Sequence, residues 1–128
     1  MILYATLGTN DLARATRFYD AVLAPLGVVR RVTKPDEAGY GTQEDGRCRI
    51  WIVRPFDKHP ASRGNGSMLA LEAPDRATVD AVHAAGLAHA GSDDGPPGVR
   101  SYHPHFYACY LRDPDGNKIS AVCETPPA

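Results

Sequence analysis

The stretch TNDLARATRFYDAV, residues 9–22, recurs in outline 64 residues later as APDRATVDAVHAAG, residues 73–86. Each stretch follows a short apolar run, carries an aspartate at its third position and continues with apolar residues at helical spacing. Asp11 and Asp75 have side chains that can accept hydrogen bonds from the free N–H groups at a helix start. The two stretches therefore predict two helices, one in each half of the 128-residue chain.

Strand-like segments follow each predicted helix. In this interpretation Gly27 ends the first helix and Gly86 ends the second. The predicted strands cover residues 28–33, a stretch around Tyr40 and residues 47–53, and then residues 87–90, 106–111 and 118–122. The turn at residues 113–117, Asp-Pro-Asp-Gly-Asn, joins the last two. Each half reads β-α-β-β-β, which predicts an α+β fold of two βαβββ modules.

Composition excludes several classes of protein. A chain of 128 residues with 43% hydrophobic and 23% charged residues is typical of one globular domain. A net charge of -1 gives no basic field, so we expect no nucleic-acid partner. No apolar run is long enough for a membrane span, and the first residues do not resemble a signal peptide. The three cysteines, Cys48, Cys109 and Cys123, are interpreted as reduced thiols, which predicts a cytoplasmic protein.

Two motifs carry a resemblance to a known family. Asp11-Leu12 followed by Phe18-Tyr19, together with the Asp-Pro-Asp-Gly-Asn turn at 113–117, resembles the glyoxalase / bleomycin-resistance / extradiol-dioxygenase superfamily, also called vicinal oxygen chelate proteins. Residues 95–104 are similar to an uncharacterised bacterial glyoxalase-like subgroup. The resemblance implies one domain over residues 1–128, with module one at about 1–58 and module two at about 66–124. It also implies curved sheets that form a cup, and a homodimer.

The resemblance also implies where a divalent metal would be bound. The four ligand positions fall on Tyr4, Met68, Ser120 and Trp51, or on Ile50 in place of Trp51 if the register shifts by one. Zinc, iron, manganese and magnesium sites use imidazole, carboxylate or thiolate groups, and none of these side chains supplies one. We therefore expect no metal and no other cofactor.

Strand parity predicts which other side chains face the cup. A three-residue loop at 114–116 sets Tyr110 opposite Ser120, and Tyr107, Cys109 and Leu111 then face the helices. The predicted substrate-binding lining consists of Tyr4, Thr6, Arg49, Trp51, Met68, Tyr110 and Ser120. Aromatic rings could stack on a planar ligand, and Arg49 could bind an anionic group. The alternative is that the apolar members are core residues and that Arg49 is an exposed strand residue.

His103 and His105 precede a strand that is predicted to line the cup. His103 and Tyr110 are the candidates for acid–base catalysis, and the pair His103 and His105 is an alternative half of a metal site. His83 and His89 have no evident partner in the sequence. The glycine-bearing residues 91–98 match no nucleotide-binding motif and are predicted to form a connecting loop.

Three functions remain open from the sequence. The first is a metal-free protein that binds a small planar or anionic molecule in an aromatic cup. The second is a glyoxalase-like lyase or isomerase with altered catalytic residues. The third is a conventional metal-dependent lactoylglutathione lyase or dioxygenase, which the four ligand positions disfavour.

Overall fold

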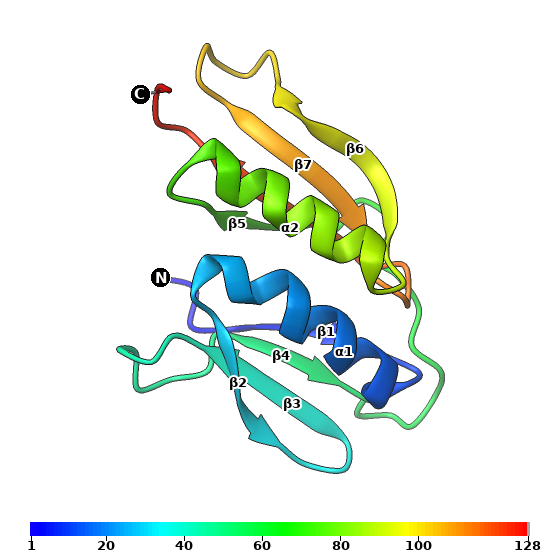
Figure 1. The fold of residues 1–128 in the computed structure, drawn as a ribbon. Helices are drawn as coiled ribbons and strands as arrows, with labels where there is room; N and C mark the ends of the chain where they lie inside the picture. The colour runs from blue at the N-terminus through cyan, green and yellow to red at the C-terminus, as the bar shows by residue number, and fades with distance from the viewer. Residues whose placement is uncertain (128) are drawn as a thin grey trace.

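The computed structural model describes residues 1–127, and its elements follow the repeated β-α-β-β-β order (Figure 1). Module one contains β1 (Ala5–Gly8), α1 (Leu12–Leu23), the 3₁₀ turn η1 (Ala24–Leu26), β2 (Val29–Thr33), β3 (Glu37–Gly41) and β4 (Ile50–Val53). Module two contains β5 (Leu69–Glu72), α2 (Arg76–Ala88), β6 (Ser92–Val99), β7 (Tyr107–Arg112) and β8 (Lys118–Cys123). No helix in the described part of the chain is long and apolar enough to cross a membrane.

Each module forms its own four-stranded mixed sheet. The strand orders are β1-β4-β3-β2 and β5-β8-β7-β6. In both sheets the first strand runs parallel to the last, and the other neighbours are antiparallel. The predicted α+β fold with two βαβββ modules is confirmed.

The 64-residue offset holds in three dimensions. Ala5 and Leu69, which begin β1 and β5, lie 64 positions apart. Asp11 caps α1 by accepting the N–H of Arg14 at 3.0 Å, and Asp75 caps α2 by accepting the N–H of Thr78 at 2.8 Å. The predicted helix starts are therefore confirmed at both positions.

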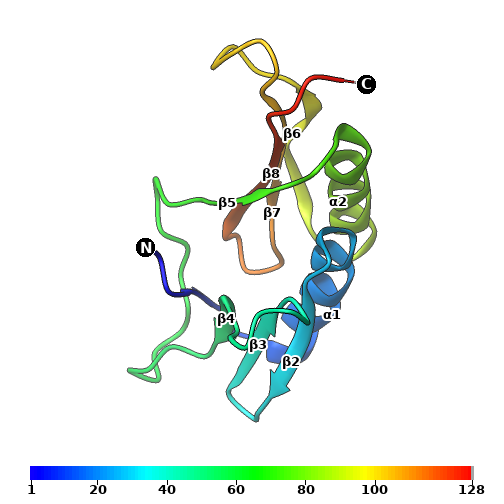
Figure 2. The same cartoon turned by 90° about the vertical axis from the view of Figure 1, so that its left-hand side faces the viewer.

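Both helices cover the same side of the two sheets and pack against each other (Figures 1 and 2). The hydrophobic core lies between helices and sheets, and Cys109 on β7 donates its thiol to the carbonyl of Val79 on α2 at 3.6 Å. The segment 54–68 crosses on the other side, away from the helices (Figure 2). The core therefore occupies one face of each sheet, and the other face is open for a binding site.

The end of α2 differs from the prediction. Gly86 does not end the helix, which continues to Ala88, so the strand predicted at 87–90 does not exist. Gly86 lies inside α2, where it packs against Leu111 of β7. A Cβ at residue 86 would lie 2.6 Å from a methyl carbon of Leu111, so a larger residue would not fit. The glycine therefore permits close packing of the helix on β7, and close packing cannot be distinguished from a helix stop by local sequence.

The second strand of module two lies where a loop was predicted. β6 covers Ser92–Val99 and includes Pro96 and Pro97. Proline has no N–H group and is tolerated on an edge strand, and β6 is an edge strand of its sheet. The pairing of β6 with β7 is also irregular between Asp93 and Gly98. An irregular edge strand can thus accept the prolines that indicated a loop.

We predict that Ala90→Gly stabilises the protein by about 0.5 to 1 kcal/mol. Ala90 has a φ of 70°, in the left-handed region that costs a residue with a Cβ, and it follows the C-terminal end of α2. Gly91 N–H donates to the Gly86 carbonyl at 2.9 Å and holds this ending in place. Urea unfolding measures the change. The control Ala84→Gly, at an exposed position inside the helix, should destabilise, and equal signs for the two variants would contradict the prediction.

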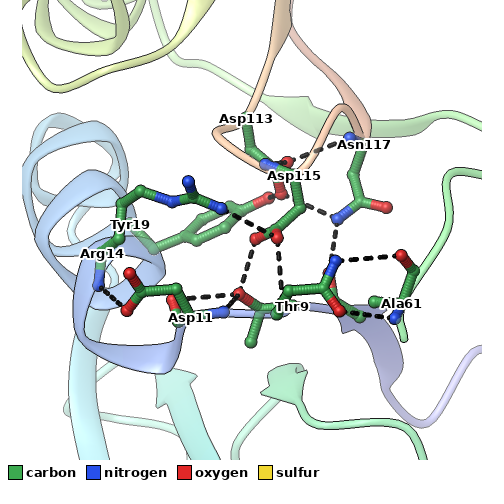
Figure 3. Close-up of polar contacts among 10 residues, drawn as sticks. Thr9, Asp11, Arg14, Tyr19, Ala61, Asp113, Asp115 and Asn117 are labelled. Carbon is green, nitrogen blue, oxygen red and sulfur yellow. Dashed lines mark hydrogen bonds and ion pairs between the residues drawn. The ribbon is translucent and has the colours of Figure 1, made fainter. Parts of the chain in front are cut away.

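A polar cluster joins the two modules at the turn between β7 and β8 (Figure 3). Asp115 accepts hydrogen bonds from the Thr9 hydroxyl at 2.5 Å, the Asn10 N–H at 2.9 Å and the Arg14 guanidinium at 3.1 Å. All three donors belong to module one, around the start of α1. The turn of module two is thus fastened to the helix start of module one.

The buried carboxylate of Asp113 accepts hydrogen bonds from other residues of the same turn. One of its oxygens accepts the N–H groups of Asp115 and Asn117, and the other accepts the Tyr19 hydroxyl at 2.5 Å and the Asn117 amide at 2.9 Å. Burial, with the nearby Asp113 charge, raises the pKa of Tyr19 well above its usual value, so the hydroxyl remains a donor. We call this cluster the intermodule clasp; its members are Thr9, Asn10, Arg14, Tyr19, Asp113, Asp115 and Asn117. It connects the turn of module two to α1 and to the β1–α1 connection of module one.

Candidate binding cavity in module two

The side chains predicted to share one cup line two separate concavities. Tyr4, Thr6 and Trp51 line a concavity of about 590 Å³ in module one. Met68 and Tyr110 line a larger one of about 870 Å³ in module two, which we call the module-two cavity. The structure therefore groups most of the predicted lining residues module by module, on the faces of the sheets that carry no helix. Thr6 and Met68 also share a smaller pocket of about 200 Å³ between the modules.

The predicted register of the last hairpin is confirmed. Tyr110 lies opposite Ser120 across β7 and β8, and Tyr107, Cys109 and Leu111 pack toward the helices. Ser120 shares the face of Tyr110 but is only 2% exposed, and its hydroxyl has no hydrogen-bond partner within residues 1–127. Ser120 therefore lies beneath the wall of the module-two cavity and does not line it.

Arg49 does not join Trp51. It precedes β4 and contributes to a different pocket, beside Leu3 and other apolar residues near the edge of β1. Its guanidinium donates to an Asp45 carboxylate oxygen at 2.6 Å and to the Leu3 carbonyl at 2.9 Å. The strand alternation that places Trp51 does not extend back to Arg49, because the regular strand begins only at Ile50.

The positions that hold a divalent metal in related proteins do not fit one here. Thr6 pairs with Trp51 in module one as Ala70 pairs with Ser120 in module two, which identifies Trp51, not Ile50, as the counterpart of Ser120. Tyr4, Trp51, Met68 and Ser120 then supply phenol, indole, thioether and hydroxyl groups, and divalent ions prefer other donors. Within residues 1–127 no three histidine, cysteine or acidic side chains are grouped so as to hold a metal ion.

His103 has both ring nitrogens engaged. Its Nδ1 accepts the backbone N–H of His105 at 3.2 Å, so in the neutral ring the proton is on Nε2. Nε2 then donates to a Glu124 carboxylate oxygen at 2.6 Å. His103 lines the module-two cavity, but in this arrangement it offers no free lone pair to a substrate proton.

Three cations of the module-two cavity were not identified from the sequence. Arg100, Arg112 and Lys118 line it, beside the acids Asp94 and Glu124. Parity could have found two of them, since Lys118 lies two residues before Ser120 and Arg112 two residues after Tyr110 on the same strand faces. No comparable signal places Arg100, because it follows the irregular strand β6.

Tyr110 lies between two of these cations. The Arg100 guanidinium carbon is 5.3 Å from the centre of the Tyr110 ring, and Lys118 Nζ is 5.2 Å from it. Burial and the neighbouring Tyr102 raise the pKa of the Tyr110 hydroxyl, against the opposing effect of Arg100. The hydroxyl therefore stays protonated near neutral pH and acts as a hydrogen-bond donor.

His83 has a partner that the sequence did not indicate. It is buried on α2, and its Nε2 lies 2.8 Å from a carboxylate oxygen of Asp93 on β6. The hydrogen bond to His83 holds the pKa of Asp93 below its usual value. This pair fastens β6 to the helix and lies outside the lining of the module-two cavity.

Two βαβββ modules joined by a clasp, each with an open sheet face, define the class of protein. The chain belongs to the glyoxalase/bleomycin resistance protein/dioxygenase superfamily, whose family model matches residues 1–121. The family predicted from the Asp-Leu, Phe-Tyr and Asp-Pro-Asp-Gly-Asn motifs is therefore confirmed.

Solved structures agree with this assignment. A glyoxalase/bleomycin resistance protein from Albidiferax ferrireducens T118 is 37% identical with a TM-score of 0.85, over 96% of this chain and 98% of that chain. A lactoylglutathione lyase from Agrobacterium tumefaciens is 22% identical with a TM-score of 0.67, over 96% and 92%. The fosfomycin resistance protein FosX from Mesorhizobium loti is 19% identical with a TM-score of 0.67, over 95% and 90%. The last two likenesses concern the fold alone. No curated protein matches the sequence.

Proposed function

We propose that this protein binds a small planar or anionic molecule in the module-two cavity, without the divalent metal used by related proteins. The cavity itself carries the proposal: it measures about 870 Å³, and its lining combines aromatic residues with three cations. The volume is typical of small-molecule sites, and the lining is more polar than the mostly apolar walls that such sites usually have. The aromatic members are Tyr102, Phe106 and Tyr110.

Binding without turnover agrees better with the site than acid–base catalysis does. His103 has both nitrogens hydrogen-bonded, and the Tyr110 hydroxyl has a raised pKa. Neither group is arranged as a general base. A lyase or isomerase activity remains the competing function, and analysis of the bound molecule for conversion to product distinguishes the two.

The proposal includes a homodimer that acts in the cytoplasm. Cys109 and Cys123 are buried and unpaired, and Cys48 is half-buried and unpaired, which agrees with a reducing compartment. Light scattering after gel filtration measures the oligomeric state.

We predict that Met68→Ala weakens binding of a ligand about fivefold, because Met68 lines the cavity and contributes apolar surface to it. A library of planar and anionic compounds is screened by thermal shift, and the dissociation constant of each hit is measured by calorimetry. The control is Leu87→Ala: Leu87 on α2 is 48% exposed and Met68 is 47% exposed, but Leu87 does not line the cavity. Equal effects of the two substitutions would place the ligand elsewhere.

The metal is tested on the same preparation. Protein purified without chelator is incubated with zinc, nickel or manganese and then dialysed into metal-free buffer. We expect it to retain no stoichiometric ion. An ion held at Tyr4, Trp51, Met68 and Ser120 would overturn the metal-free part of the proposal, and an ion lost in His103→Ala would assign a site to His103 and His105.

A further inference from the structure

Arg100 forms no salt bridge with an acidic side chain in the described part of the chain, although the charge of Asp93 lies close enough to interact with it. Its guanidinium lines the module-two cavity and donates to two neutral acceptors, the carbonyls of Gly98 at 2.8 Å and Pro96 at 2.5 Å. A guanidinium has five N–H donors, so several remain free for a ligand. Arg100 is thus held in place and still available to an anion.

The positive charge of Lys118 is only partly neutralised by a neighbouring acid. Its ammonium lies 3.4 Å from an Asp94 oxygen, and Arg112 Nε lies 3.0 Å from the same oxygen. One carboxylate therefore serves two cations. The other acid of the cavity, Glu124, is engaged by His103 at 2.6 Å. With His103 neutral, three cations face two carboxylates, and the cavity wall keeps an excess of positive charge.

Tyr110 stands between these cations. It belongs to β7, with Arg100 arriving from the end of β6 on one side and Lys118 from β8 on the other. Arg100 and Lys118 both lie close to the ring of Tyr110, so a ligand has little room to stack on that ring. The hydroxyl of Tyr110 has no hydrogen-bond partner in the described part of the chain and is left to donate to a ligand.

We propose that the Tyr110 hydroxyl and the Arg100 guanidinium form a receptor for one oxyanion, with the Lys118 ammonium on the other side of the Tyr110 ring adding positive charge. The ligand is a small aromatic molecule bearing a carboxylate or phosphate group. This inference rests on the proposed function of the module-two cavity. Tyr102 and Phe106, whose rings pack edge to face at 4.9 Å, supply the wall for the aromatic part. Hydrogen bonds from charged donors to an oxyanion are about twice as strong as neutral ones, so the charge of the ligand dominates its selection.

The first experiment compares four probes by calorimetry on the full chain: benzoate, phenyl phosphate, benzamide and benzyl alcohol. We expect at least one anion to bind about tenfold or more tightly than benzamide, because each charge-assisted hydrogen bond contributes that much or more. Benzoate and phenyl phosphate decide between the two anionic groups. Equal affinity for benzoate, phenyl phosphate and benzamide overturns the receptor, as does failure of both anions to bind at millimolar concentration.

The second experiment assigns the receptor atoms. Lys118→Met and Tyr110→Phe should each weaken binding of the preferred anion about tenfold and weaken binding of benzamide by a smaller factor, because benzamide is uncharged but its carbonyl can still accept a hydrogen bond from Tyr110. Lys34→Met, a change of charge on the far module, is the control and should alter neither. Thermal melts confirm that each variant folds. If Met68→Ala weakens all probes but the anion has no advantage, the cavity binds ligands and the receptor is refuted. If the ligands found in the library also bind the Met68→Ala variant with unchanged affinity, the proposed function is contradicted.

Discussion

Phe18→Ala is expected to lower the free energy of unfolding by about 4 kcal/mol. Phe18 on α1 is fully buried, and its ring packs against Tyr19 with the ring centres 4.9 Å apart. It also reaches module two, since a Cβ on Gly91 would lie 2.5 Å from its ring. The substitution leaves a cavity where the two modules meet, and backbone on both sides limits collapse into it. Urea unfolding monitored by circular dichroism measures the loss.

Phe56→Ala is the matched control for this prediction. The chemistry is identical, but Phe56 is 98% exposed in the segment between the modules. We expect its effect on the free energy of unfolding to stay within about 0.5 kcal/mol. A loss below about 1 kcal/mol for Phe18→Ala would mean that the packing of Phe18 against Tyr19 and Gly91 contributes little to stability.

Features with a local cause could be predicted from the sequence. Asp11 and Asp75 cap the helices with their own side chains, and the loop at 114–116 sets the register of Tyr110 with Ser120. Each depends on a few neighbouring residues or on strand alternation. The 64-residue repeat then extended local evidence to the whole fold, because it required both halves to form the same module.

Features that depend on distant packing could not be predicted in the same way. Gly86 was interpreted as a helix end, although its role is to admit Leu111 against α2. Pro96 and Pro97 indicated a loop, although the edge of a sheet tolerates them. In each case the glycine or proline does mark a special position in the fold. The reason for it is packing or pairing with an element elsewhere in the chain.

The candidate site shows the same division. Parity placed Tyr110 on the face that lines the module-two cavity, and the 64-residue offset from Tyr4 placed Met68 there. The grouping of Trp51 with Met68 depended on how the two sheets are oriented, and that orientation is set by the packing of α1 on α2 and by the clasp. Neither contact has a local sequence signal, so Trp51 and Met68 line different concavities, and of the predicted module-one lining only Thr6 shares a small pocket with Met68.

Asp113→Ala is expected to lower the free energy of unfolding by about 3 kcal/mol. Asp113 is 4% exposed and accepts four hydrogen bonds, three of them from Tyr19 and from the N–H groups of Asp115 and Asn117. Alanine cannot accept any of them. The Tyr19 hydroxyl is buried, so no bulk water replaces the lost acceptor, and the unpaired donor adds to the loss.

A double-mutant cycle with Tyr19→Phe separates the clasp from the turn. Tyr19→Phe removes only the bond between α1 of module one and the turn of module two, and we expect it to cost about 1.5 kcal/mol. Asp113→Ala removes that bond and the hydrogen bonds within the turn. If the bond joins the modules as the geometry indicates, the double variant is less destabilised than the sum by about 1 kcal/mol or more. Asp57→Ala, at an exposed carboxylate between the modules, is the control and should change stability by less than about 0.5 kcal/mol. Strict additivity of the two clasp substitutions would show that Asp113 stabilises only its own turn, and the connection between the modules would then depend on the Asp115 contacts and on the packing of the two helices.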